Sequence, residues 1–312
     1  MSSINFPLLR ESFENAELKI FNSFPVHEYF ETVVDRVDRL RDDFHISVIG
    51  EVPLGSVFLP IYRIATPHLQ DKANTVLLTA GVHGNEQGGV CGALNFMQED
   101  ALYLDSDIGV ICYPCINPRG LVLNSRWAGD GPHNRTDLNR NFIDESDIKE
   151  VKLLIASLRQ TARKYLASID LHETMPQDNL VMMMQYSERD INPYKETPDS
   201  FYMWEICNDR SKRIGNAVIE RLKESVSVCD WERIFDDYNS GGVIFYPEGG
   251  VNQDYVNEGP LDYYLQKNFT NHSFTTETYG DICVTERGKI QQKVIKLIVN
   301  ELLRNSNGVG SS

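Results

Sequence analysis

Apolar residues recur along the chain with two spacings, one typical of helices and one typical of buried strands. Residues 27–40 and 286–304 carry apolar positions three and four residues apart, which predicts amphipathic helices. Short apolar runs such as "NTVLLTAG" predict buried strands. In chain order the pattern predicts a helix over 27–40, strands over 45–52, 57–66 and 75–80, a helix over 88–97, a strand over 107–116, a helix over 147–160, a strand over 165–172, a helix over 208–225, a short strand over 273–278 and a closing helix over 286–304.

The alternation of strands and helices predicts an α/β fold. We expect a single domain with a central twisted sheet of mixed parallel and antiparallel strands and with helices on both faces. A polar leader is predicted over residues 1–26, and a mobile tail of small residues over 305–312. Ligands of such folds collect at the carboxyl ends of the strands. The residues that follow the predicted strands are therefore the first candidates for chemistry.

The composition and charge of the chain exclude several classes of partner. Its 312 residues include 30 Lys and Arg against 45 Asp and Glu, a formal net charge of -15 at pH 7. This charge opposes binding to nucleic acid or to an anionic membrane, since phosphate binding needs clustered Lys and Arg. No apolar run approaches the roughly 18 residues of a membrane span, and the N-terminal residues do not resemble a signal peptide. We therefore expect a cytoplasmic protein.

One pair of cysteines has the spacing of a redox or metal motif. Cys112 and Cys115 form a C-x-x-C inside "VICYPCIN", which has the pattern of a buried strand and lacks a second pair. Reduced core thiols explain this pair better than structural zinc or a disulfide does.

Candidate metal ligands follow two of the predicted strands. "TAGVHGNEQGG" places His83 and Glu86 directly after the strand over 75–80, and "YLASIDLH" ends in His172. A catalytic zinc usually takes three protein ligands, for example two His and one Glu, and keeps a position for water or substrate. Taken singly, each residue is explained as well by a polar turn or by a histidine bonded to backbone. Together, at two strand ends, they favour a zinc site.

Two further segments carry polar candidates. "NPRGLVLNSRWAGDGPHNRTDLNRNF" is rich in Asn and Arg, and a guanidinium can hold a carboxylate with two hydrogen bonds at any working pH. Its candidate side chains are Arg126, Arg135, Asn139 and Arg140, although a surface loop would tolerate the same residues. In "NHSFTTETYGD", Glu277 stands at the end of a short strand. A carboxylate there, beside metal-bound water, could take and return protons during hydrolysis.

The motifs "HGNE", "NPRG", "DLNRNF", "DLH", "FYPEGG" and "SFTTETYGD", in this order, resemble those of the zinc carboxypeptidases of the carboxypeptidase A type. Each motif is weak alone, whereas the combination is specific. The resemblance implies a carboxypeptidase-like catalytic domain over residues 27–304, with one zinc held by His83, Glu86 and His172. It implies an enzyme that removes C-terminal amino acids from peptides by means of metal-activated water. The glycines around His83 then serve to turn the backbone sharply at a strand end.

The resemblance also implies roles in the reaction. Glu277 resembles the general base and acid, and Arg126 resembles the residue that polarises the scissile carbonyl. Asp137 matches the carboxylate that orients the first zinc histidine, a contact that zinc-bound imidazoles normally have. The loop "WAGDGPHNR" is longer than in compact members of the family, so Arg135 is an alternative to Arg126.

Further roles concern substrate binding. Asn139 and Arg140 resemble the pair that binds the terminal carboxylate of the substrate, and Tyr246 resembles the mobile tyrosine that closes on it. Tyr255 is the alternative to Tyr246. The side-chain pocket is expected near "GGVNQDY", where the Val-Asn-Gln run carries no charge that would select a basic or acidic side chain.

Three alternatives stay open. The aspartoacylase and succinylglutamate desuccinylase branch resembles this chain in "HGNE", "NPR", "DLNR" and "DLH". Its enzymes remove acyl groups from amino acids and carry an extra β-rich domain, which we do not expect in the 35 residues after Glu277. An amidase acting on murein peptides would use the same zinc site, and a non-catalytic binding module would be indicated by the loss of a ligand, which is not seen. Each catalytic alternative implies a small peptide or acyl-amino-acid substrate with a free carboxylate.

Overall fold

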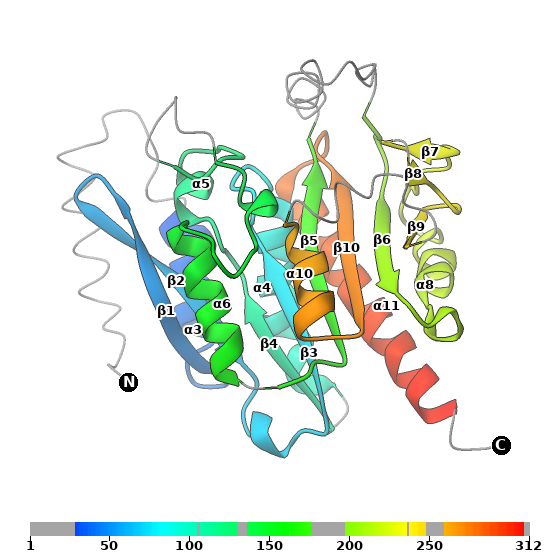
Figure 1. The fold of residues 1–312 in the computed structure, drawn as a ribbon, viewed down its shortest axis with the longest axis horizontal. Coiled ribbons are helices and arrows are strands. Elements are labelled where there is room, and N and C mark those ends of the chain that lie inside the picture. Colours follow the sequence, from blue (N-terminus) through cyan, green and yellow to red (C-terminus); the bar gives the residue numbers. More distant parts are fainter. Residues whose placement is uncertain are drawn as a thin grey trace.

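The structure of the protein, a computed structural model, describes residues 29–104, 107–129, 136–161, 163–175, 197–235, 237–247 and 259–308. Within these residues, eight strands form one central sheet (Figure 1). The strands of this sheet are β1 (His45–Leu54), β2 (Val57–Ala65), β3 (Asn74–Ala80), β4 (Ile108–Tyr113), β5 (Ala167–Thr174), β6 (Tyr202–Cys207), β9 (Val243–Tyr246) and β10 (His272–Tyr279). A separate short hairpin is formed by β7 (Arg233–Ile234) and β8 (Asp237–Tyr238).

The order of strands across the sheet is β1-β2-β4-β3-β5-β10-β6-β9. Neighbouring strands are parallel from β4 through β3 and β5 to β10, and again between β6 and β9. They are antiparallel between β1 and β2, between β2 and β4, and between β10 and β6. The predicted mixed sheet is thus confirmed, and its central parallel strands end along one edge.

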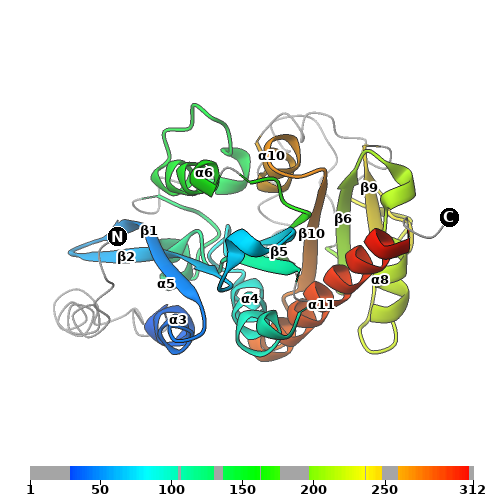
Figure 2. The same ribbon diagram turned by 90° about the horizontal axis from the view of Figure 1, so that it is seen from below.

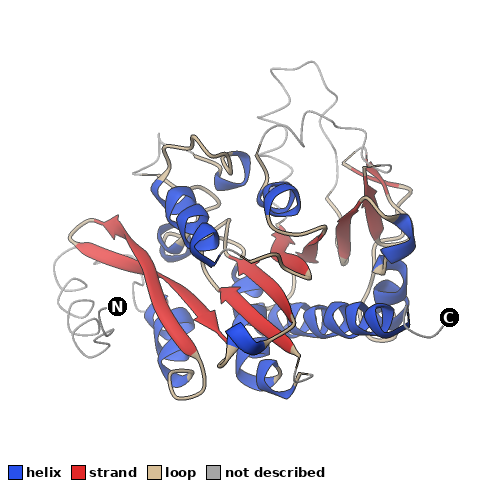
Figure 3. Ribbon diagram, turned by 60° about the horizontal axis from the view of Figure 1, so that its bottom comes forward, coloured by secondary structure: helices blue, strands red, loops and turns tan. Residues whose placement is uncertain are grey.

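Helices cover both faces of the sheet, as predicted (Figures 2 and 3). The α-helices are α3 (Asp35–Arg39), α4 (Gln87–Glu99), α5 (Pro118–Val122), α6 (Lys149–Thr161), α8 (Gly215–Leu222), α10 (Leu261–Asn268) and α11 (Val284–Gly308). A π-helical turn, η1 (Phe30–Val34), precedes α3, and the 3-10 turns are η2 (Leu69–Asp71), η3 (Ala101–Tyr103), η4 (Leu138–Arg140) and η6 (Arg210–Lys212). Figure 2 shows α6 and α10 on one face of the sheet and α3, α4 and α11 on the other.

The apolar core is divided by the sheet. The larger part joins η1, α3, α4, α8 and α11 to one face, and includes Val90, Leu94, Phe274 and Ile298. The smaller part joins α6 and α10 to the other face. Burial of the apolar side chains on both faces is the main favourable contribution to folding, at roughly 25 cal/mol per Å² of apolar surface removed from water. Loops connect the strands at both ends of the sheet. The candidate site lies at the carboxyl ends of the central parallel strands.

The structure also differs from the predicted elements in places. The sequence prediction did not include β6, β9 and α10, which are short, with six, four and eight residues. The predicted strand over 107–116 ends earlier, at Tyr113, and α11 continues to Gly308, inside the segment predicted as a tail. Cys112 and Cys115 are both buried, as predicted, and burial raises the pKa of both thiols. The predicted leader over residues 1–26 lies outside the described residues.

Candidate metal centre and active site

A sharp turn after β3 brings the HGNE motif to the carboxyl edge of the sheet. Gly81 has a φ of +63°, a left-handed conformation that glycine adopts without steric cost. At Gly84 the chain passes so close to the start of α5 that an added Cβ would lie 1.9 Å from the carbonyl carbon of Gly120. The backbone N–H of Asn117 donates to the carbonyl of Gly81 over 2.8 Å, which ties the NPRG segment to this turn. The two motifs therefore meet because Gly81 permits the sharp turn and Gly84 permits a close approach that a side chain would block.

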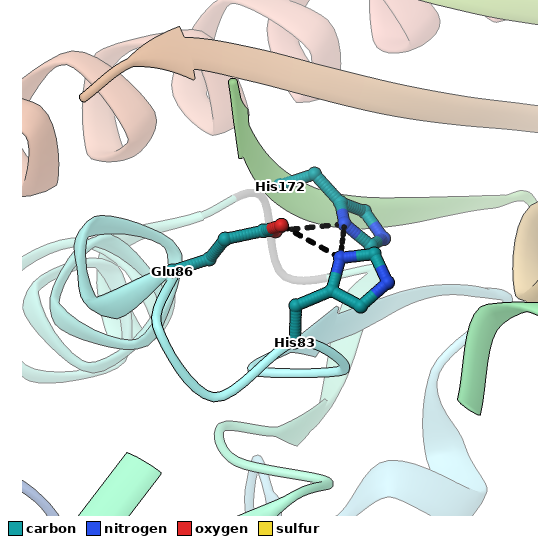
Figure 4. Close-up of side chains that lie close together, drawn as sticks. All are labelled: His83, Glu86 and His172. Carbon is teal, nitrogen blue, oxygen red and sulfur yellow. Dashed lines mark hydrogen bonds and ion pairs between the residues drawn. The ribbon is translucent and has the colours of Figure 1, made fainter. Parts of the chain in front are cut away.

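Three side chains meet in the metal centre predicted from the sequence (Figure 4). His83 and Glu86 come from the turn after β3, and His172 comes from the end of β5. The Nδ1 atom of His83 lies 2.6 Å from Oε1 of Glu86, and Nδ1 of His172 lies 2.8 Å from Oε2. The two Nδ1 atoms are 3.2 Å apart. All three residues are buried, with exposed fractions of 1–3%.

Each histidine is oriented by a second carboxylate behind it. Nε2 of His83 lies 3.1 Å from Oδ1 of Asp137, and Nε2 of His172 lies 2.9 Å from Oδ2 of Asp170. An ionised carboxylate only accepts hydrogen bonds, so each Nε2 carries the hydrogen and a neutral ring presents an electron pair at Nδ1. Asp137 thus has the contact that the resemblance implied for it.

The convergence of these atoms fits a bound cation. Two imidazole electron pairs and the carboxylate oxygens of Glu86 face one another at 2.6–3.2 Å, an arrangement that repels itself unless a positive charge lies among them. Tetrahedral zinc with bonds of about 2.0–2.1 Å would separate its donor atoms by about 3.3 Å. The two Nδ1 atoms, 3.2 Å apart, match this spacing, whereas the oxygens of Glu86 lie closer to the rings, at 2.6 and 2.8 Å. The donor set of two His and one Glu is also one that catalytic zinc sites use.

The pKa values at the centre reflect the same charges. Burial alone raises the pKa of Glu86, but the charges of His83 and His172 outweigh burial and hold it well below its usual range. Burial lowers the pKa of His172, yet Asp170 and Glu86 outweigh it and the pKa lies well above its ordinary value. The negative groups around His172 therefore favour a positive charge at the place where a cation fits.

Arg126 lies beside this centre. Its Nη1 is 3.5 Å from Oε1 of Glu86, and its Nη2 donates to Oδ2 of Asp137 over 3.2 Å. Burial raises the pKa of Asp137, but the charges of Arg126 and His83 outweigh it and hold that pKa well below its usual range. Arg135, the alternative to Arg126, lies outside the described residues. The geometry therefore brings the guanidinium of Arg126 to Glu86, one of the candidate metal ligands, whereas its role toward a carbonyl stays a prediction.

Asn139 and Arg140 form the 3-10 turn that follows Asp137. The side-chain oxygen of Asn139 accepts a hydrogen bond of 2.8 Å from the backbone N–H of Leu261, at the start of α10. This contact orients the amide so that its NH₂ group is the part that can donate to a ligand. Arg140 donates from Nη1 to the carbonyl of Asn139 over 2.8 Å, and its charge also lowers the pKa of Asp137. Arg140 therefore acts electrostatically on Asp137, whereas the roles of Asn139 and Arg140 toward a substrate stay predictions.

Glu277 lies on β10, the strand next to β5. In the register of these two parallel strands Glu277 is paired with His172, so both side chains project from the same face. The hydroxyl of Thr174 donates to Oε2 of Glu277 over 3.1 Å. Glu277, the predicted acid and base, is therefore next to His172, a candidate metal ligand, and is partly buried and hydrogen bonded.

Tyr246 occupies the edge strand β9. It is buried, and its hydroxyl donates to Oδ2 of Asp237 over 2.8 Å. Its role as the tyrosine that closes on the substrate stays a prediction, and Tyr255 and the expected side-chain pocket near "GGVNQDY" lie outside the described residues.

Sequence reasoning missed two polar contacts of the site. Asp170 is two residues before His172, and the two-residue period of a strand puts both on one face, so the signal was present in "DLH". The contact of Thr174 with Glu277 joins residues 103 positions apart and depends on β10 lying beside β5. No local pattern in the sequence indicates it.

Comparison with known protein families finds a match to one family model. Residues 72–197 match the family model of the Succinylglutamate desuccinylase/Aspartoacylase catalytic domain. This segment contains the HGNE, NPRG, DLNR and DLH motifs. No curated protein sequence matches the chain.

Several solved structures share the fold. A presumed metallopeptidase from Shewanella denitrificans is 17% identical with a TM-score of 0.65, over 89% of this chain and 90% of that one. Bovine thrombin-activatable fibrinolysis inhibitor, solved with a tick carboxypeptidase inhibitor, is 15% identical with a TM-score of 0.59, over 89% and 97%. A succinylglutamate desuccinylase from Silicibacter sp. TM1040 is 14% identical with a TM-score of 0.51, over 83% and 67%.

These similarities confirm the resemblance that the motifs indicated. The fold is that of metallocarboxypeptidases, and the catalytic-domain pattern is that of the related desuccinylase and aspartoacylase branch. Fold and pattern together support a hydrolase. No helix among the described residues is long and apolar enough to cross a membrane.

Proposed function

We propose that this chain is a zinc-dependent metallocarboxypeptidase, which cleaves the amide bond next to the free C-terminal carboxylate of a peptide. The observation that carries the proposal is the convergence of His83, Glu86 and His172, with Glu277 paired to His172 on the adjacent strand. Three ligands leave zinc a position for water or substrate, and the neighbouring carboxylate supplies a group for proton transfer.

The residues around the centre divide the chemistry. Zinc held by the three ligands would act as a Lewis acid that polarises a carbonyl and makes water a better nucleophile near neutral pH. Glu277 would accept the proton of the attacking water and return it to the nitrogen of the leaving amine. Arg126 would donate hydrogen bonds to the carbonyl oxygen as negative charge develops there. The tie of Arg126 to Glu86 and Asp137 supports this role, because it fixes the guanidinium before substrate arrives.

Asn139 and Arg140 would hold the free carboxylate of the substrate. The amide of Asn139 is oriented by Leu261, so its NH₂ group can donate to a carboxylate oxygen. Arg140 would add a charge-assisted and bidentate contact. This grip would place the scissile bond at a fixed distance from the carboxylate, which is what distinguishes an enzyme that acts at a chain end.

A second candidate is the removal of an acyl group from an N-acyl amino acid. The match of residues 72–197 to the desuccinylase and aspartoacylase catalytic domain favours it. The chemistry is the same, since an N-acyl amino acid also has an amide bond beside a free α-carboxylate. The two candidates therefore share Glu277, Arg126 and Arg140 and differ in what lies on the acyl side of the bond.

A substrate panel tests the proposal. It contains peptides with a free or an amidated C-terminus, N-acyl amino acids with a free or an amidated carboxyl, and murein peptides. We expect cleavage of free acids with strong rejection of amides, because an amide cannot accept a charge-assisted contact from Arg140 as a carboxylate does. Truncating one partner of a buried charged pair costs on the order of 2–5 kcal/mol, which corresponds to roughly 30-fold to several-thousand-fold in kcat/KM.

The variant Arg140→Ala is the matched control. It should cleave both forms poorly and lose most of the discrimination between free acid and amide. Equal cleavage of both forms by the parent would contradict carboxylate recognition. An unchanged high ratio in Arg140→Ala would move that role to another arginine. Preference for acyl-amino acids over peptides would select the second candidate.

A further inference from the structure

The carboxylate of Glu277 is flanked by polar groups from the strands on both sides of it. Glu277 is paired with His172 on β5 and with Tyr202 on β6. Paired residues of neighbouring strands project from the same face of a sheet, and so do residues two apart on one strand. Thr174, two residues after His172, therefore lies on the same face as Glu277 and Tyr202. The sheet brings the three side chains together from segments far apart in the sequence.

The hydrogen bonds among these three groups have a definite direction. Oγ1 of Thr174 lies 3.1 Å from Oε2 of Glu277 and 2.6 Å from the hydroxyl oxygen of Tyr202. An ionised carboxylate can only accept, so the single hydroxyl proton of Thr174 points to Glu277. The proton of Tyr202 must then point to Thr174. Because both hydroxyls can also accept, Thr174 can stay hydrogen bonded to Glu277 after the carboxylate has taken a proton.

The surroundings of Tyr202 hold its hydroxyl in place. Tyr202 has an exposed fraction of 0%, and its ring packs edge-on against Trp204 with centroids 5.2 Å apart. The ring of Phe235 lies 6.5 Å away in a similar orientation. Trp204 is in turn fixed by donation from its indole nitrogen to Asp237 over 3.3 Å. A ring confined in this way keeps its hydroxyl in a fixed position, from which it holds the hydroxyl of Thr174.

We propose that Thr174 and Tyr202 are positioning residues for Glu277 in the hydrolytic reaction. Thr174 holds one oxygen of the carboxylate and restricts its rotation, and Tyr202 fixes the hydroxyl of Thr174. The inference rests on the proposed function, since it assigns the two hydroxyls to the group that moves the proton. A side chain held in its productive orientation loses less entropy on reaching the transition state, and small misplacements are costly.

Kinetics of three variants, with a control variant described below, test the proposal. The substrate is whichever free acid in the panel the parent cleaves, and bound zinc is measured in each variant. Thr174→Val keeps the shape and removes the hydroxyl, so kcat should fall about tenfold while KM stays within about twofold. Tyr202→Phe should lower kcat by a smaller factor, about threefold. Thr174→Ser restores the hydroxyl and should return kcat to within about threefold of the parent.

The control for general loss of a buried hydroxyl is Thr75→Val. Thr75 is 1% exposed and lies near the start of β3, at the opposite end of the strand from the HGNE motif. Its hydroxyl accepts a hydrogen bond from Arg163 over 2.6 Å. It should lower stability without lowering kcat. If kcat fell as much in Thr75→Val as in Thr174→Val, the effect at Thr174 would come from general loss of a buried hydroxyl and not from positioning of Glu277.

A double-mutant cycle supplies a readout that needs no activity. The unfolding equilibrium in denaturant is measured for the parent, Thr174→Val, Glu277→Ala and the double variant. Thr174→Val should raise the unfolding constant about fivefold more in the parent than in Glu277→Ala, since the hydrogen bond exists only in the parent. If Thr174→Val does not fold, the same cycle is made with Tyr202→Phe, which should couple to Glu277 about twofold.

The outcomes separate the two proposals. A parent that cleaves nothing in the panel overturns the proposed function, and the positioning role falls with it. A parent that cleaves free acids, with an additive cycle and with kcat unchanged in Thr174→Val, overturns the positioning role alone. Coupling in the cycle, a fall in kcat at constant KM and rescue by serine support it.

Discussion

Two regions of the site each contain a buried carboxylate that receives hydrogen bonds, and they use it differently. In the metal corner, formed by His83, Glu86, His172, Asp137 and Asp170, carboxylates orient two histidines so that their electron pairs face each other. The aromatic side is formed by Tyr202, Trp204, Phe235, Asp237 and Tyr246. There the carboxylate of Asp237 accepts hydrogen bonds from the indole N–H of Trp204 and from the hydroxyl of Tyr246.

The difference indicates which buried polar groups can bind a ligand and take part in a reaction, and which only stabilise the fold. In the aromatic side the donors and the acceptor satisfy one another, and no further ligand is needed. In the metal corner, orientation leaves like electron pairs 3.2 Å apart, and this arrangement is stable only with a cation or a proton among them. Glu277 lies between the two regions and is hydrogen bonded through Thr174 to the aromatic side.

The largest expected effect concerns Glu277 itself. Glu277→Gln keeps the shape of the side chain but cannot accept the proton of the attacking water. General acid and base catalysis typically contributes roughly 10²–10⁴-fold, so kcat should fall by about that factor while bound zinc stays at the level of the parent. Steady-state kinetics with metal analysis of the same preparation check this. Turnover within about threefold of the parent would remove Glu277 from the mechanism.

A smaller effect is expected behind the metal corner. Asp170→Asn weakens the acceptor that orients His172, and loss of such a contact typically costs 10–100-fold in metal affinity. The dissociation constant for zinc, measured by competition with a chromophoric chelator, should rise by about that factor. Asp237→Asn alters the corresponding carboxylate of the aromatic side and should change the constant less than about threefold. Equal effects of the two variants would contradict the distinction between the regions.

The smallest effect is expected in the aromatic side. Tyr246→Phe removes a donor from the buried Asp237, and leaving a buried acceptor short of a hydrogen bond costs about 1–3 kcal/mol. We expect this loss in the free energy of unfolding, with kcat/KM lowered less than about tenfold. A fall in kcat/KM above a hundredfold at unchanged stability would instead show that Tyr246 leaves Asp237 and closes on the substrate.

The two regions also differ in how much of them could be predicted from the sequence. His83, Glu86 and His172 stand directly at the ends of strongly apolar strands, so local pattern and residue chemistry sufficed to assemble them. Asp170 was accessible through the two-residue period of the same strand. The aromatic side depends on β6 and β9, whose short apolar runs "YMWEIC" and "VIFY" were not predicted as strands, and on the pairing of these two strands.

Long-range register accounts for what the sequence could not predict. Thr174 and Tyr202 reach Glu277 only because β10 lies between β5 and β6, although β10 follows β6 by more than 60 residues in the chain. Pairing of distant strands is set by the packing of the whole sheet rather than by local propensity. The same holds for Asn139, whose orientation is fixed by Leu261.

The central claim is that His83, Glu86 and His172 hold one zinc that hydrolysis requires. The most direct test is metal analysis of the purified protein and of His172→Ala, combined with activity before and after treatment with a chelator. We predict about one zinc per chain in the parent, loss of hydrolysis with loss of the metal, recovery on adding zinc back, and no bound zinc in His172→Ala. Zinc bound by His172→Ala as tightly as by the parent, or hydrolysis that persists after the metal has been removed, would contradict the account.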